Sequence, residues 1–176
     1  MNDLLLLSAL LAGPQHGYAL KKQVGLLTGQ GAMHNNLVYP LLRRFVENRW
    51  VSHKQSAGER GQTREVYALT PKGKRELLRR LTEYGMEDAR SENGFRLRVG
   101  LFAFLEHATR EHILAMRDKF LAAREERLER IVSAVGAGSW GSEVVQFFRE
   151  QLRAEREWIA GLTRKAKRET SLIKHA

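Results

Sequence analysis

An amide, a phenol and a guanidinium group share one face of a predicted helix in the first half of the chain. Asn36, Tyr39 and Arg43 are spaced i, i+3 and i+7, which places them on one side of an α-helix, and Arg44 follows directly. Near a helix N-terminus these groups can contact both base edges and phosphate oxygens. Taken alone, these side chains are more simply interpreted as a solvent-exposed helix face. The elements before and after the helix are therefore needed to decide between that interpretation and a DNA-binding face.

The N-terminal run MNDLLLLSALLAG combines features of a signal peptide and of a buried helix. A signal peptide needs positive charge before its apolar run, whereas here Asp3 precedes it and the run is too short to span a bilayer. A buried helix that ends at Gly13, with Pro14 blocking its continuation, explains the run better. We therefore expect a cytoplasmic chain without a membrane segment.

Two further helices are predicted before residue 50. The second runs from about residue 17 to residue 28, and the third begins near Asn35 or Asn36, both good N-cap residues. Pro40 must then lie within about the first turn, because deeper in the helix it would remove a backbone hydrogen bond. The inward stripe of the third helix is predicted to be Leu37, Leu41 and Phe45.

A β-hairpin pattern with a basic, glycine-flanked tip follows at once. Residues 50–56 and 64–69 are predicted strands, and His53 falls on the inward side of the first. Arg60 and Arg64 flank the tip, where they could reach a neighbouring groove or phosphate. This order of elements is a winged helix-turn-helix, in which the third helix enters the DNA major groove.

Three segments of the sequence resemble the PadR family of bacterial transcriptional regulators. They are HGY at residues 16–18, LVYPLLRR at residues 37–44 and YALTPKG at residues 67–73. The resemblance implies a winged-helix DNA-binding domain, a helical C-terminal dimer region, and a small molecule that releases the protein from DNA. Glu65 and Val66 depart from the family pattern, which commonly has a basic residue and an aromatic there.

The second helix adds candidates to this surface. Tyr18 can contact a phosphate or pack with its hydroxyl on the backbone, and His16 can contact DNA or serve as a capping or packing residue. The complete set of expected DNA contacts is Tyr18, Lys21, Asn35, Asn36, Tyr39, Arg43, Arg44, Arg60 and Arg64.

The second half of the chain contains two long amphipathic segments. In the first, leucines at 114, 121 and 128 recur every seven residues. In the second, apolar residues follow 3-4 spacing, with Glu155 interrupting the seam. We expect this seam to form a homodimer, and a monomeric helical cap is the alternative. The expected dimer residues are Val145, Phe148, Leu152, Ile159 and Leu162.

The segment FRLRVGLFAFL, residues 95–105, reads as a buried helix. Phe95, Phe102 and Phe104 give it a high aromatic density at the predicted junction of two domains, where ligand pockets are common. An apolar effector site there is one hypothesis, and ordinary core packing is the other.

Charge and composition limit the function classes. Thirty basic against twenty acidic residues give a net charge of +10, and residues 1–84 alone carry 13 basic and 6 acidic side chains. This excess suits a polyanionic partner. The chain has no cysteine, which excludes disulfides and cysteine–zinc sites. His107, Glu111 and His112 lack the spacing and the further ligand of a metal site.

We therefore expect a winged helix-turn-helix DNA-binding domain over residues 1–90 and a helical dimerisation domain over residues 91–176. The expected function is that of a cytoplasmic, homodimeric transcriptional repressor that binds an inverted repeat. No enzyme, cofactor or metal chemistry is expected from the sequence. The alternative is a winged-helix module that binds protein, or that packages DNA without sequence preference.

Overall fold

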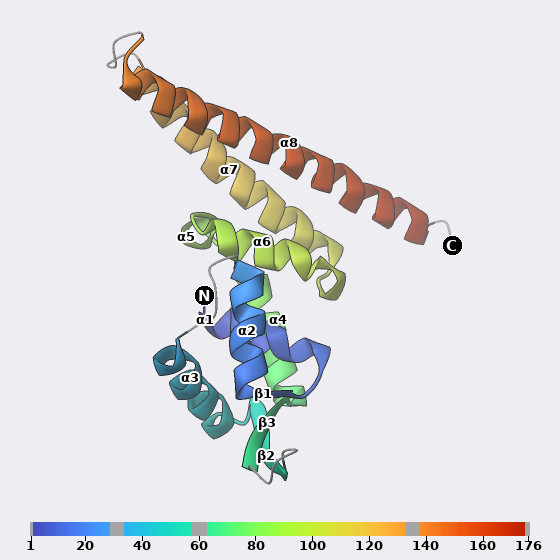
Figure 1. The fold of residues 1–176 in the computed structure, drawn as a ribbon. Helices are drawn as coiled ribbons and strands as arrows, with labels where there is room; N and C mark the ends of the chain where they lie inside the picture. Colours follow the sequence, from blue (N-terminus) through green and yellow to red (C-terminus); the bar gives the residue numbers. More distant parts are fainter. Residues whose placement is uncertain (1, 29–33, 58–62, 133–137, 175–176) are drawn as a thin grey trace. The chain divides into compact units, whose positions relative to one another are not determined.

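The computed structural model describes residues 2–28, 34–57, 63–132 and 138–174. Within these ranges the chain is mainly helical with a small three-stranded antiparallel sheet, which confirms the predicted fold class. The chain divides into two compact units, the first ending at Glu83 and the second beginning at Tyr84 (Figure 1).

The first unit contains four helices and three strands among its described residues. Gly13 follows the first helical segment with φ 125°, a conformation that glycine adopts readily, so the predicted helix end before Pro14 is confirmed. In chain order the elements are α1 (Asn2–Ala9), the 3-10 turn η1 (Leu10–Ala12), β1 (Gln15–His16), α2 (Gly17–Thr28), α3 (Asn35–Glu47), β2 (Val51–Ala57), β3 (Thr63–Leu69) and α4 (Pro71–Thr82).

Leucines from all four helices form the core of this unit. The side chains of Leu6, Leu20, Leu42 and Leu77 are fully buried, and burying each one stabilises the fold by about 2 kcal/mol. The helices α2 and α3 thereby pack beside each other and present their polar faces outward.

The start of α3 differs from the sequence prediction. His34, in an extended conformation, is the N-cap and makes no side-chain capping hydrogen bond, so neither Asn35 nor Asn36 caps the helix. Pro40 is the sixth helical residue and lies beyond the first turn. Because proline has no backbone N–H, the carbonyl oxygen of Asn36 lacks the helical hydrogen bond that residue 40 would otherwise donate. Both residues are exposed, so water can supply that hydrogen bond.

The inward face of α3 is also rotated from the predicted one. Val38, Leu42 and Phe45 are fully buried, whereas Leu37 is 46% exposed and Leu41 is half-buried. Both stripes satisfy helical spacing and share Phe45. The orientation of the helix on its neighbours therefore decides which stripe is buried.

The sheet contains a strand that the sequence did not predict. Strand β3 lies between β1 and β2, and β1 pairs through Gln15 with Tyr67 and through His16 with Val66. A two-residue strand is too short to leave an alternating pattern. His53, predicted to point inward, is exposed on β2, although its ring stacks on Tyr67 at a centroid distance of 6.3 Å.

The second unit is helical throughout its described elements, and it corrects the predicted helix over residues 95–105. That segment splits into the end of one helix and a 3-10 turn, with Leu101 at φ −106° between them. The elements are α5 (Met86–Ala89), α6 (Glu92–Gly100), the 3-10 turn η2 (Phe102–Phe104), α7 (His107–Val132) and α8 (Trp140–Lys174).

The long helices α7 and α8 run side by side (Figure 1). Leucines at 114, 121 and 128 of α7 and the apolar residues Val145, Leu152 and Ile159 of α8 are buried in the seam between them. An ion pair joins Arg149 to Glu129, and another joins Arg117 to Glu155. These pairs match an antiparallel arrangement, because the partner number falls as the α8 number rises.

Candidate nucleic-acid interface

Helix α3 presents a polar face opposite its buried stripe. Because Val38 and Leu42 face the core, Asn36 and Arg43 lie on the far side of the helix and both are exposed. Tyr39 lies on one flank and is 41% exposed. The structure thus brings these three predicted residues to one accessible side. Nothing is described for the side chain of Asn35.

Tyr39 packs against the first residue of α2. A Cβ atom added at Gly17 would lie 3.1 Å from the Tyr39 ring, so glycine permits the close approach of these two helices. The HGY motif and the Tyr39 of LVYPLLRR, separated in the sequence, therefore meet in space. Neither motif alone predicted this contact.

A cavity of about 480 Å³ opens beside this contact, at the N-terminus of α2. Three tyrosines from three different elements contribute phenol groups to its wall, and the first turn of α2 contributes backbone N–H groups that an α-helix leaves without intrahelical partners. The lining residues are His16, Gly17, Tyr18, Ala19, Tyr39, Arg64, Glu65 and Tyr67.

The polar groups that line this cavity differ in charge and in hydrogen bonding. The Tyr67 hydroxyl donates a 2.5 Å hydrogen bond to Glu65, and burial together with this bond raises the pKa of the Tyr67 phenol. Arg64 is exposed at the rim, and Nδ1 of His16 is a buried atom with no hydrogen-bond partner within the described part of the chain. The Glu65 carboxylate is thus hydrogen-bonded to Tyr67, whereas Arg64 and His16 are available to bind an anion.

The other predicted DNA contacts in this unit differ in how exposed their side chains are. Tyr18 is 75% exposed, and Lys21 is half-buried. Lys22 is exposed four residues after Tyr18 and shares its face, a relation that i, i+4 spacing could have revealed. Lys54 is exposed on β2 and was also missed. Arg60 lies outside the described residues.

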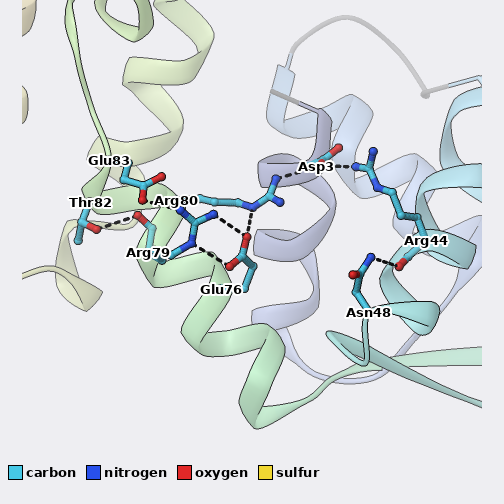
Figure 2. A network of polar contacts seen from close by, with 8 residues as sticks. All are labelled: Asp3, Arg44, Asn48, Glu76, Arg79, Arg80, Thr82 and Glu83. Atoms are coloured by element: carbon cyan, nitrogen blue, oxygen red, sulfur yellow. Dashed lines mark hydrogen bonds and ion pairs between the residues drawn. The ribbon is translucent and has the colours of Figure 1, made fainter.

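Arg44 turns away from the polar face. Figure 2 shows its guanidinium directed at Asp3 of α1, with which it forms an ion pair. The same carboxylate accepts a 2.9 Å hydrogen bond from Arg80 of α4. Adjacent helical residues differ by about 100°, so Arg44 lies on the flank of α3 opposite Tyr39.

In the second unit, the expected dimer seam is occupied within the chain. Val145, Leu152 and Ile159 are buried between α8 and α7, and Phe148 and Leu162 are half-buried. A second apolar stripe lies beside this seam and is exposed. It consists of Trp140, Val144, Phe147 and Trp158, exposed by 90, 53, 56 and 41%. The 4-3 spacing of Trp140, Val144 and Phe147 was a signal that sequence reasoning passed over, and Trp158 follows on the same face eleven residues later.

The three predicted effector residues have different environments. Phe95 is fully buried and contacts the Trp158 ring edge-on at 5.7 Å, Phe102 is half-buried, and Phe104 is 48% exposed. A cavity of about 310 Å³ lies next to Trp158, between α6, α7 and α8. Its wall combines aromatic and charged groups, including Phe148, Arg96 and Arg124.

Metal-ligating side chains do not cluster in groups of three or more among the described residues. His107 Nε2 lies 3.3 Å from the Glu111 carboxylate, whereas His112 Nε2 lies 2.8 Å from the carbonyl oxygen of Tyr84. None of the helices in the described ranges is long and apolar enough to cross a membrane.

Comparison with known proteins adds a family match. Residues 6–79 match the transcriptional regulator PadR-like family. Among solved structures, a protein of Thermoplasma acidophilum described as a transcriptional regulator is 36% identical, with 43% of this chain and 71% of that chain covered and a TM-score of 0.40. No similar protein was found among curated proteins.

Two further solved structures are similar to this chain. A PadR family transcriptional regulator from Eggerthella lenta is 32% identical over 43% of this chain and 64% of that chain, with a TM-score of 0.38. Bacillus subtilis PadR, crystallised in complex with operator DNA, is 16% identical over 94% of this chain and 98% of that chain, with a TM-score of 0.47.

Proposed function

Residues 6–79 of this chain belong to the transcriptional regulator PadR-like family, and from this premise we propose that the protein is a DNA-binding transcriptional regulator, without enzymatic activity, that acts in the cytoplasm. The observation that carries the proposal is the outward face of α3. Asn36 and Arg43 are exposed on one side of a helix that stands in the recognition position of a winged helix-turn-helix. Their amide and guanidinium groups suit adenine and guanine edges.

The cavity at the start of α2 supports a backbone contact beside this base-reading face. A phosphate in this cavity can accept from the backbone N–H groups of the first turn of α2, from the phenols of Tyr18 and Tyr39, and from the guanidinium of Arg64. Glu65 opposes an anion, because its carboxylate stays charged while it accepts from Tyr67, and the donors around it must outweigh this repulsion. We therefore assign this cavity to a DNA phosphate and α3 to the bases. Lys22, rather than the half-buried Lys21, adds a cation on the Tyr18 side.

Dimerisation is the second part of the proposal. The exposed stripe that contains Trp140, Phe147 and Trp158 is unusual for a solvent-facing helix, and it lies beside the intramolecular seam. Burial of this stripe against a second copy gives a homodimer with two α3 helices. Such a dimer would bind an inverted repeat.

Repression and its release by a small molecule complete the proposal. A dimer bound over a promoter blocks access to it. The cavity beside Trp158 in the second unit could bind an effector with aromatic and charged groups. A ligand there would act only through its different affinities for DNA-competent and DNA-incompetent dimers.

Selection from a random duplex pool tests the function, followed by footprinting of the DNA next to the gene. A regulator should prefer its selected duplex to an unrelated one by about a thousandfold or more. Equal affinity for both duplexes would support the architectural alternative. No binding to either would leave the winged helix as a protein-interaction module.

A further inference from the structure

The two adjacent arginines of α3 have different surroundings. Arg43 lies on the outward face of the helix, whereas Arg44 lies one residue further around and forms an ion pair with Asp3. The Arg44 side chain is nevertheless 49% exposed, so it remains close to solvent and to any nucleic acid that lies along α3.

Asp3 is held in place by contacts that do not involve Arg44. Its Oδ2 atom accepts a 2.9 Å hydrogen bond from Nη1 of Arg80. Arg80 in turn donates to Glu76 at 2.6 Å from Nε, and its guanidinium lies 4.9 Å from the centre of the Trp50 ring. Figure 2 shows the resulting chain of contacts from α4 through α1 to α3. The carboxylate is therefore a preformed acceptor for Arg44.

We propose that Asp3 is a specificity-determining residue, which occupies the Arg44 guanidinium in place of a DNA phosphate. A carboxylate and a phosphate bind a guanidinium in the same way, so the two compete for it. Phosphate contacts strengthen binding to every sequence alike. Because Asp3 keeps the Arg44 guanidinium in an ion pair, it lowers the affinity of the protein for DNA of any sequence. The choice between sequences is then made by the outward residues of α3. This inference rests on the proposed DNA-binding function.

The salt dependence of binding to a short duplex of random sequence tests it. Each additional phosphate contact steepens the fall of log K with log salt by about 0.9. Asp3→Asn should therefore steepen the slope by about 0.9, so that its affinity falls about threefold more than that of the wild type between about 50 and 200 mM salt. The double variant Asp3→Asn/Arg44→Ala should return to the wild-type slope.

Two matched variants separate this effect from net charge and from folding. Glu126→Gln makes the same change in charge at an exposed position of α7 and should leave the slope unchanged. Arg44→Ala in the presence of Asp3 should also leave it unchanged, because the arginine is already occupied. This second expectation holds even if Asp3→Asn does not fold, and far-ultraviolet circular dichroism checks each variant.

The outcomes are distinguishable. An unchanged slope in folded Asp3→Asn, a steepened slope that persists in the double variant, or a shallower slope in Arg44→Ala would each overturn the inference while DNA binding itself stands. If the wild-type protein binds neither random nor selected duplexes, the proposed function fails and the inference fails with it.

Discussion

Arg117 on α7 and Glu155 on α8 form a two-point ion pair inside the second unit. Nε and Nη2 of Arg117 donate to the two carboxylate oxygens of Glu155, at 2.8 and 3.0 Å. The Arg117 side chain is only 2% exposed, donates also to the carbonyl of Ala89, and lies against the rings of Phe95 and Phe120. The glutamate that interrupts the apolar seam in the sequence is therefore paired and mostly buried.

Removal of one partner of this pair should be strongly destabilising. Glu155→Ala should cost about 3–5 kcal/mol of unfolding free energy because it leaves the Arg117 charge buried without its carboxylate. The double variant Arg117→Met/Glu155→Leu should recover most of the loss. Urea unfolding followed by circular dichroism measures both. The exposed pair of Arg149 and Glu129 is the control, since Arg149→Ala should cost less than about 1 kcal/mol.

A Cβ atom should not be tolerated at Gly73. It would lie 1.9 Å from the carbonyl oxygen of Trp50, a backbone atom that cannot move aside cheaply. Gly73→Ala should therefore push α4 away from the segment that joins α3 to β2, and it should cost about 3 kcal/mol in thermal or urea unfolding. Gly100→Ala is the matched control, because the added atom meets nothing within 4 Å. Equal stability of the two variants would contradict the prediction.

Arg43 and Tyr39 should contribute differently to DNA binding. Arg43→Ala should cost about 1–3 kcal/mol on the selected duplex if the guanidinium contacts a base, and less on a random duplex. Tyr39→Phe removes only the hydroxyl proposed to meet a phosphate, so both duplexes should be affected alike. Fluorescence anisotropy measures the affinities. Arg127→Ala, which removes the same charge from an exposed position of α7, should change neither.

The two apolar stripes of α8 should separate dimerisation from folding. Phe147 is 56% exposed in the protomer, so Phe147→Asp should leave the helical signal intact and shift the protein to monomers. Leu152 is 3% exposed, and Leu152→Asp should instead unfold the helical pair because it buries an unpaired charge. Light scattering and circular dichroism distinguish the two results. A dimer that survives Phe147→Asp would exclude this stripe as the contact.

Stability at acidic pH should depend on Glu76. Hydrogen bonds from Arg79 and Arg80 lower the pKa of its carboxyl from 4.5 to about 2, against an opposing effect of burial. The folded-state pKa is below the unfolded value, so ionised Glu76 stabilises the fold above pH 4.5 and this contribution fades as the pH falls towards 2. Wild-type protein should lose more stability than Glu76→Gln across that interval in urea unfolding. An equal loss of stability with falling pH in the wild-type protein and in Glu76→Gln would contradict this prediction.

Sequence reasoning succeeded where a local signal determines a local structure. Gly13 before Pro14 ends the first helical segment, as predicted. A signal of the same kind begins α4, where Thr70 precedes Pro71 and its hydroxyl accepts from the Gly73 N–H at 3.0 Å. The conformational limits of proline and the capping chemistry of threonine act within a few residues. The family resemblance of residues 16–18, 37–44 and 67–73 likewise depends on short motifs.

Residue spacing was insufficient where the position of a helix against its neighbours mattered. The pattern of α3 fits burial of Leu37 and Leu41 as well as burial of Val38 and Leu42, and packing against the other helices selects the second pair. In the same way, 3-4 spacing in α8 cannot tell the stripe that faces α7 from the stripe of Trp140 and Phe147.

The sequence by itself determined the main helices, the hairpin of β2 and β3, the end of the first helical segment and the polar set that includes Asn36, Tyr39 and Arg43, but not strand β1 or the break within residues 95–105. Only the tertiary structure decided that Tyr39 meets Gly17, that Arg44 turns to Asp3, and that Glu155 has a partner. The reason is physical. Backbone conformation and capping depend on neighbours along the chain, whereas the rotation of each helix and the partner of each charge depend on side chains distant in sequence that the core brings into contact.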